Sequence, residues 1–358
     1  MRSVECEKLL KYFTDKNENY FLIGSCVVTE IVEQYVIDEI NKHNEPILLY
    51  GCISKKITDA VRNRNNIKII RINDLEKILN NGSIDYSEIN NTSLCYTIKT
   101  ASLSNRDYKL VTKIHQNSFY RLFTKPNPFP FLIIAQGCTS KCSFCHSKFY
   151  IGKVKSKTID IIADEYRNFL KKKYKFIDII AENTGAYGID INKSLPELLE
   201  ALDGITPDNK VKWMIDGLDP IWLIKYKDRL APLIAKKRIT VINLPVQSGN
   251  VRVLKLMNRY PDREKTIETL KEYRKLNPKL HLQGVFIVGF PSETDDDFND
   301  TLSLINEIRF DDVTFIQYSE FDICESSKIK DKVPENVINN RINIGREYLI
   351  KIGIKEIR

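Results

Sequence analysis

The chain has 358 residues, of which 42% are hydrophobic and 28% are charged, with 14 Gly and 13 Pro. This composition excludes collagen-like, low-complexity and wholly disordered chains, and the length suits either several domains or one barrel with a smaller domain. The 55 Lys and Arg exceed the 47 Asp and Glu by eight, a mild surplus that permits a nucleic-acid or acidic-peptide partner without requiring one.

The N-terminal segment begins with charged residues and lacks the apolar core of a secretory signal. No run approaches the roughly 18 apolar residues that a membrane span needs. We therefore expect a cytoplasmic protein without membrane contact, in a compartment where thiols stay reduced. Eight cysteines in such a compartment indicate metal ligands or buried small hydrophobes rather than disulfides.

The first 75 or so residues alternate between helical and strand-like segments, which predicts a Rossmann-like parallel α/β domain. Cys26 and Cys52 come just after two of its strands, at the sheet edge where open α/β sheets bind ligands. The expected strands are 20–23, 47–50 and 67–70, and the expected helices are 4–13, a stretch ending near 42, and 53–64.

Residues 80–128 are polar and irregular, and three prolines close to their end favour an extended linker. The sequence thus predicts an N-terminal domain at 1–80, a connecting segment at 81–128, a barrel core at 129–320 and a C-terminal loop with a closing helix at 321–358.

Six strand candidates follow the linker, with helical patterns between them. Residues 158–172 form the clearest helix, because their apolar side chains recur on one face. Six β/α units are too few for a closed eight-stranded barrel, so we expect an open partial (β/α)6 barrel whose active side lies at the carboxyl ends of its strands. The expected strands are 131–135, 176–181, 211–215, 240–244, 282–288 and 313–318.

Three cysteines crowd into the loop after the first barrel strand, in the segment GCTSKCSFC at 137–145. Cys138, Cys142 and Cys145 are spaced to bind one face of a [4Fe–4S] cluster, leaving one iron without a protein ligand. That iron can chelate the amino and carboxylate groups of S-adenosylmethionine (SAM) and pass an electron to its sulfonium, which yields a 5′-deoxyadenosyl radical. Zinc with His146 as a further ligand is the weaker alternative.

Three further blocks fall at strand ends: AENTGAYG at 181–188, LPVQSG at 244–249 with VLKLMNR at 253–259, and VGFPSET at 288–294. Together with the cysteine segment they resemble the radical SAM superfamily. Within it they resemble the methylthiotransferases, which modify tRNA adenosine or a ribosomal-protein aspartate. The resemblance covers essentially the whole chain and implies a transferase that inserts sulfur, as a methylthio group, at an unactivated C–H carbon.

The resemblance also implies which residues contact SAM. Glu182 would accept the SAM ammonium, Gln247 and Ser248 would hydrogen-bond its polar groups, and Thr184 and Gly185 would line the same site. Each of these residues, taken alone, also suits an ordinary βα turn or helix N-terminus. No catalytic side chain is expected beyond the clusters and SAM.

A second, auxiliary [4Fe–4S] cluster is implied in the N-terminal domain, where it would hold the sulfur that is transferred. Cys26 and Cys52 match two of the family's three cysteine segments, and Cys6 is the candidate substitute for the third. Alternatively Cys95 completes the site, or two cysteines hold a different cluster or none.

Two departures bear on the substrate. Residues 318–327 replace the family's YSxRxGTxA loop and introduce Cys324, and we expect the TRAM β-barrel that follows in relatives to be missing. We therefore expect a peptide or protein substrate, with tRNA adenosine as the alternative. Non-methylthiolating radical chemistry on a peptide and a non-enzymatic iron–sulfur module are further alternatives. A flavodoxin- or ferredoxin-type electron donor and a monomeric state complete the expectations.

Overall fold

The computed structural model describes residues 9, 12–13, 16–18, 20–25, 30–71, 74, 78 and 130–356 except 209. It divides into two compact units, Met1–Phe131 with His146–Gly152, and Leu132–Cys145 with Lys153–Arg358. Each unit is described by itself. The predicted connecting segment 81–128 lies outside the described residues, and the predicted domain boundaries stay predictions.

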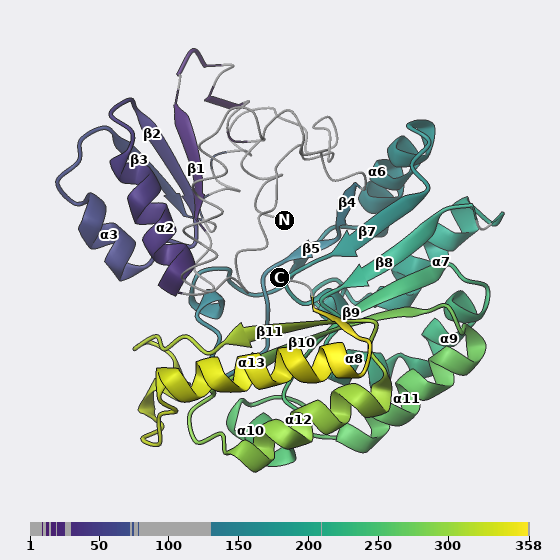
Figure 1. The fold of residues 1–358 in the computed structure, drawn as a ribbon. Coiled ribbons are helices and arrows are strands. Elements are labelled where there is room, and N and C mark those ends of the chain that lie inside the picture. Colours follow the sequence, from purple (N-terminus) through teal and green to yellow (C-terminus); the bar gives the residue numbers. More distant parts are fainter. Residues whose placement is uncertain are drawn as a thin grey trace. The chain divides into compact units, whose positions relative to one another are not determined.

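The first unit contains a parallel sheet of three strands, β1 (Phe21–Ser25), β2 (Ile47–Gly51) and β3 (Ile67–Arg71), in the order β1-β2-β3. Helices α2 (Glu30–Asn41) and α3 (Lys55–Val61) lie beside it (Figure 1). Every residue of β2 is buried, as befits the central strand of a parallel sheet. The predicted Rossmann-like α/β unit is confirmed. The unit also contains the 3₁₀ turn η4 (Ser147–Phe149).

The second unit is built on a seven-stranded sheet in the order β12-β11-β10-β9-β8-β7-β4. All pairs from β7 to β12 are parallel. Two short strands, β5 (Ala135–Gln136) and β6 (Lys155–Ser156), pair antiparallel beside it. The strands of the large sheet are β4 (Phe131–Ile133), β7 (Phe176–Ile180), β8 (Lys212–Asp216), β9 (Ile239–Gln247), β10 (His281–Val288), β11 (Asp312–Gln317) and β12 (Lys355–Glu356).

Helices connect these strands and gather along one side of the sheet (Figure 1). They are α6 (Ile159–Lys171), α7 (Leu195–Ile205), α8 (Pro220–Lys225), α9 (Lys227–Ala235), α10 (Val251–Leu256), α11 (Arg263–Leu276), α12 (Asp295–Ile308) and α13 (Glu335–Lys351), with 3₁₀ turns η5 (Thr184–Ala186) and η6 (Glu325–Lys328). Helix α12 begins at a capping box, in which Thr294 and Asp297 satisfy each other's backbone N–H groups.

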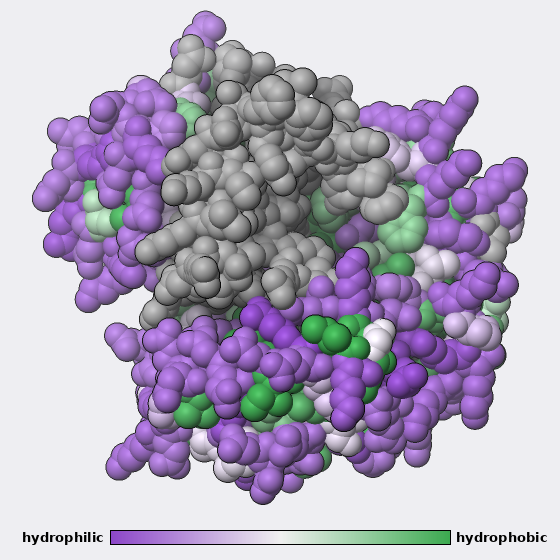
Figure 2. Space-filling view, viewed as in Figure 1, coloured by the Kyte–Doolittle hydropathy of each residue, from purple (hydrophilic) through white to green (hydrophobic). Residues whose placement is uncertain are grey.

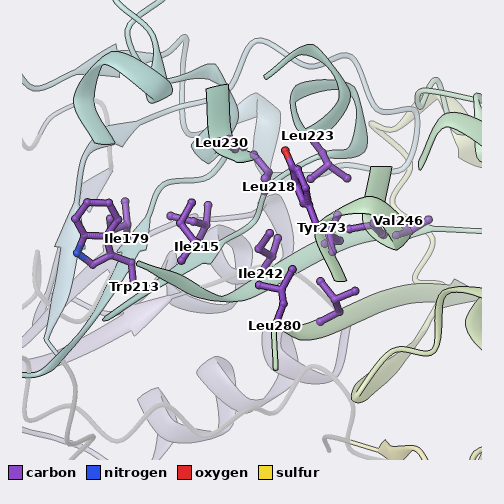
Figure 3. Packing of buried hydrophobic residues seen from close by; sticks show 14 of the residues in the cluster. Ile179, Trp213, Ile215, Leu218, Leu223, Leu230, Ile242, Val246, Tyr273 and Leu280 are labelled. Atoms are coloured by element: carbon purple, nitrogen blue, oxygen red, sulfur yellow. The ribbon is translucent and has the colours of Figure 1, made fainter. Parts of the chain in front are cut away.

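The main core lies between the sheet and its helices. Along β8, Trp213 and Ile215 are buried while the alternate residues are half-buried, so one face of the strand packs into the core. Figure 3 shows Trp213 beside Ile179, and both β8 residues belong to the same cluster as Leu223 of α8, Leu230 of α9 and Tyr273 of α11. The opposite face of β8 carries the half-buried side chains of Lys212, Met214 and Asp216.

The fold class agrees with the sequence prediction of an open, partial barrel of β/α units. All six predicted barrel strands are present within a few residues, the first broken after Ile133 so that its end pairs with β6. Strands β6 and β12 were not predicted, because two-residue strands carry no periodic signal. Strand β12 extends the sheet beyond β11, and in the described residues it does not pair with β4.

On the face shown in Figure 2 the described surface is mostly hydrophilic, with hydrophobic atoms over α13. Ile344 and Ile350 of that helix are exposed. Among the described residues, no helix combines the length and the apolar character that a membrane crossing requires.

Candidate functional site

The cysteine loop, residues 137–145, follows β5 and is held in place by the segment after α10. The Ser143 N–H donates to the Met257 carbonyl at 3.0 Å, and the Ser143 hydroxyl donates to the Leu256 carbonyl at 2.7 Å. The Asn258 side-chain amide donates to the Lys141 carbonyl at 2.8 Å. The loop therefore has a defined backbone path that is set by contacts from a distant part of the chain.

The C-terminal loop holds the cysteine loop from another direction. The Ser326 N–H donates to the Ser143 carbonyl at 3.1 Å, and the Cys324 thiol lies 3.5 Å from the Phe144 carbonyl. Cys324 is buried. The Phe144 ring packs against a separate apolar cluster of Val253, Met257, Ile287 and Phe290. Cys324 thus belongs to the contacts that hold the cysteine loop, which favours a structural role in its own loop over a role as a substrate-facing thiol.

Two of the cysteine sulfurs receive hydrogen bonds. The Cys142 sulfur lies 3.4 Å from the Arg259 Nη1. The Cys138 sulfur accepts from the Ser140 N–H at 3.3 Å and from the Asn183 amide at 3.8 Å. Burial raises the pKa of the Cys142 thiol, and the Arg259 charge opposes that rise. Hydrogen-bond donors around thiolates are a usual feature of iron–sulfur sites, where they tune the cluster.

The three cysteines do not form a site for a single metal ion. In the part of the chain that the structure describes, no group of three His, Cys, Asp or Glu side chains is arranged to hold one ion. A [4Fe–4S] cluster makes a different demand, because each cysteine binds a different iron atom and the sulfurs stay further apart than around one zinc ion. The observation is compatible with the predicted cluster and offers no support for the zinc alternative.

Glu182 lies directly at the start of the cysteine loop. Its Oε2 accepts the Gly137 N–H at 3.0 Å, which joins the carboxyl end of β7 to the loop. A carboxylate placed there can reach both the loop and the space above the strand ends. Its role toward the SAM ammonium stays a prediction.

Thr184 and Gly185 have local packing roles that sequence reasoning did not foresee. Thr184 is fully buried, and its hydroxyl oxygen accepts the Ala181 N–H at 3.0 Å while the hydroxyl donates to the Asp216 carbonyl. It thereby ties the end of β7 to the end of β8. A Cβ on Gly185 would lie 2.2 Å from the Cβ of Trp222. A glycine is required there by the close approach of α8, and a contact of either residue with SAM stays a prediction.

Gln247 combines two unusual features at the end of β9. Its backbone is left-handed, with φ of 76°, although it is not glycine. The residue is 9% exposed, and its Oε1 atom accepts no hydrogen bond from any described residue. Strain and an unsatisfied buried polar atom at one residue mark a binding site more often than a structural position.

Ser248 is fully buried beside Gln247, and its hydroxyl oxygen accepts the Asn250 N–H at 3.2 Å. This bond helps to begin α10, the element that supports the cysteine loop. On the described residues Ser248 therefore acts first as a turn residue.

In the first unit, Cys52 follows β2 and is 2% exposed. Its N–H donates to the Ser25 carbonyl at 3.1 Å, and the Ser25 hydroxyl donates to the Cys52 carbonyl at 2.6 Å. Ser25 is the last residue of β1, so Cys26 directly follows a residue bonded to Cys52. Cys26 itself, Cys6 and Cys95 lie outside the described residues, and the auxiliary ligand set stays a prediction.

Residues 132–305 match the family model described as the radical SAM superfamily. These residues therefore form a radical SAM domain. It is 34% identical over 230 residues to the tRNA-2-methylthio-N(6)-dimethylallyladenosine synthase of Clostridium botulinum (strain Okra / Type B1), which covers 63% of this chain and 50% of that protein. The same enzyme of Staphylococcus haemolyticus (strain JCSC1435) is 30% identical over 346 residues, 92% of this chain and 63% of that protein.

A ribosomal protein uS12 methylthiotransferase, RimO of Stenotrophomonas maltophilia (strain K279a), is 30% identical over 233 residues, 62% of this chain and 51% of that protein. Among solved structures, the radical SAM methyltransferase TsrM of Kitasatospora setae superposes with a TM-score of 0.55 at 13% identity, covering 88% of this chain and 68% of that chain. At that identity the superposition shows the fold alone. The chain spans about half the length of the first curated relatives it matches. It is methylthiotransferase-like, as the sequence resemblance indicates.

The radical SAM domain match confirms the cofactors predicted for the barrel, a [4Fe–4S] cluster and SAM. The described residues fit both groups. Three thiols lie on one anchored loop, and the unsatisfied Oε1 of Gln247 and Oδ1 of Asn183 are buried polar atoms without a described protein partner. A polar cofactor such as SAM would satisfy atoms of this kind.

Sequence reasoning missed Asn183, Arg259 and Asp219 as parts of the radical SAM site. Asn183 and Arg259 stand inside the motifs, but nothing in their spacing shows that their side chains turn toward cysteine sulfurs. Asp219 caps α8 through the Ile221 N–H and lies 2.5 Å from Arg259, a contact that depends on how α8 and α10 approach each other. The available sequence signal was Arg259 at the end of the VLKLMNR segment, close to a strand-end motif.

Proposed function

We propose that this radical SAM protein is a methylthiotransferase-type enzyme that attaches sulfur, as a methylthio group, to an unactivated C–H carbon. The anchored cysteine loop carries the proposal, since Arg259 and Asn183 donate to two of its sulfurs and Glu182 accepts its first backbone N–H. Similarity to three enzymes named for methylthio transfer supports the reaction class.

Each residue of the barrel site has a distinct part in this proposal. Cys138, Cys142 and Cys145 hold the cluster, while Glu182 and Gln247 bind polar groups of SAM from two different strands. When bound, the cluster and SAM supply the radical that removes a hydrogen atom from the substrate. The chain's own task is to orient the two cofactors and to exclude water from the strand ends.

The sulfur itself is proposed to come from an auxiliary [4Fe–4S] cluster in the first unit, held by Cys26 and Cys52 with Cys6 as the third ligand. The support is the pair of hydrogen bonds between Ser25 and Cys52, which joins the ends of β1 and β2. Two cysteines that follow these two strand ends can approach one cluster.

A peptide or protein is the proposed substrate, and a flavodoxin- or ferredoxin-type protein is the proposed electron donor. The support is loop 318–327, whose sequence departs from the family's YSxRxGTxA pattern. Similarity to two enzymes named for tRNA modification favours tRNA adenosine as the second candidate.

Iron and sulfide analysis of the anaerobically reconstituted chain tests the two-cluster arrangement. Two [4Fe–4S] clusters require about eight iron per chain, and about four would refute the sulfur-donor mechanism as stated. Changing Cys138, Cys142 and Cys145 to Ala should remove half of the iron. Retention of all iron would refute the assignment of the cysteine loop.

Mass spectrometry of a deletion strain tests the substrate. Tryptic peptides and tRNA nucleosides from deletion and parent cells are compared for a missing methylthio group. Loss of a methylthio-adenosine would replace the peptide proposal with the tRNA candidate. Loss of neither, together with another radical modification of a peptide, would favour the non-methylthiolating alternative.

A further inference from the structure

The geometry points to a tuning device beside the cysteine loop: we propose that Arg259, held by Asp219, sets the reduction potential of the cluster bound by that loop. The inference rests on the proposed placement of this cluster on Cys138, Cys142 and Cys145. It does not depend on the substrate or on the auxiliary cluster.

Arg259 is buried and fully engaged. Its Nη1 lies 3.4 Å from the Cys142 sulfur and 2.5 Å from the Asp219 Oδ2, while its Nη2 donates to the Pro245 carbonyl at 2.6 Å. The Arg259 side chain is 8% exposed and the Asp219 side chain 9%. The planar guanidinium is thus fixed between a cysteine sulfur, a carboxylate and the backbone of β9.

A charge at this place acts directly on the electron balance of the cluster. Reduction adds one electron from an external donor and breaks no bond, so the cluster with its thiolates becomes more negative by one charge. A guanidinium at a thiolate sulfur stabilises the reduced form more than the oxidised form and raises the potential. The low exposure of the pair keeps water from screening this effect.

Asp219 has the opposite sign and acts from behind the arginine. Its carboxylate contacts Arg259, and the described contacts of the Cys142 sulfur include the guanidinium rather than this carboxylate. Neutralising Asp219 should leave the Arg259 charge less compensated and raise the potential. Removing the Arg259 charge should lower it. Opposite shifts from two contacting residues are expected of an electrostatic device and not of a generally weakened fold.

A matched control lies at the amino end of β9, opposite the end of the strand that Arg259 contacts. Arg238 precedes the first residue of β9, is fully buried, and lies 2.9 Å from the Asp203 Oδ1. Arg259 instead accompanies the carboxyl end of that strand through its bond to Pro245. Arg238→Met therefore removes an equally buried, paired arginine away from the cysteine loop.

The experiment is a redox titration of the full, reconstituted chain with dithionite, followed by electron paramagnetic resonance. The signal that changes on addition of SAM identifies the cluster with the open iron. We expect Arg259→Met to lower the equilibrium constant for reduction about tenfold, a shift of about 59 mV for a one-electron couple. Asp219→Asn should shift the potential in the opposite sense, because it removes the negative charge that compensates Arg259. Asparagine also caps helices, so α8 should stay intact. Arg259→Lys should recover part of the shift.

Each outcome decides the inference. An unchanged potential in Arg259→Met with its iron intact would overturn it, and so would an equal shift in Arg238→Met. Should Arg259→Met fail to bind iron, Asp219→Asn decides, and an unchanged potential there overturns the inference. Loss of iron from the triple cysteine variant is measured separately, so a wrong cluster assignment is distinguishable from a wrong tuning role.

Discussion

Gly185→Ala tests whether the glycine of the TGAYG segment serves packing rather than ligand approach. An added Cβ would lie 2.2 Å from the Cβ, 2.3 Å from the Cγ and 2.6 Å from the Cδ1 of Trp222. The nearest atom is joined to the backbone of α8 and cannot swing away as the end of a flexible side chain could. The helix itself must shift.

Overpacking of this kind costs about 1–3 kcal/mol. We expect the upper half of that range, about 2–3 kcal/mol, because three atoms of one side chain are approached at once. Gly204→Ala is the matched control: it lies in α7 with no atom within 4 Å of the added Cβ, so it should stabilise the chain by about 0.5–1 kcal/mol.

Urea unfolding of the cofactor-free chain, followed by tryptophan fluorescence, measures both variants. The chain has two tryptophans, Trp213 and Trp222, and both lie in the second unit, so the signal reports on that unit. Equal stability of Gly185→Ala and the parent chain, combined with weaker SAM binding, would refute the packing explanation and restore a ligand-facing role.

Three further predictions follow from described contacts. Burial raises the pKa of Glu293 from 4.5 to about 7 against the opposing charge of Arg341, so the stability that this group contributes is full below pH 4.5 and is lost as pH rises to 7. We expect the free energy of unfolding of the parent chain to fall by up to about 3 kcal/mol between pH 5 and pH 8, relative to the change in Glu293→Gln, as measured by unfolding titrations at both pH values. Parallel pH profiles of the two chains would contradict this. Thr294→Ala removes the capping box of α12 and should cost about 1 kcal/mol by urea unfolding, whereas Thr294→Ser should cost little. Gln247→Gly relieves the left-handed strain and should raise the free energy of unfolding by up to about 1 kcal/mol while weakening SAM binding by calorimetry; unchanged SAM binding would remove Gln247 from the site.

The order of elements was predictable because each has a local signal. The central strand β2 is an unbroken apolar run, and α6 shows a repeating apolar face that begins at its N-cap Thr158. The three cysteines were identifiable for the same reason, since their spacing within one loop is a local property of the chain.

What sequence reasoning missed depends on contacts between distant segments. The space beside Gly185 is filled by Trp222, and the partner of Arg259 is Asp219, neither of which is adjacent in sequence. Thr184 was expected near SAM, yet its hydroxyl bonds the backbone of two neighbouring strands. Such pairings depend on how the helices pack on the sheet, and the spacing of residues in the sequence does not indicate this packing.

The long-range contacts that hold the cysteine loop also bear on when, during biosynthesis, the protein can bind its iron–sulfur cluster. Asn258 contacts Lys141 across 117 residues of chain, and Cys324 contacts Phe144 across 180. During synthesis the loop leaves the ribosome long before either support exists, and contacts of such long range form late in folding. The thiols are consequently made early and positioned last. Assembly proteins would therefore deliver the cluster to a nearly finished chain, and a truncation before residue 324 should leave a protein that takes up iron poorly.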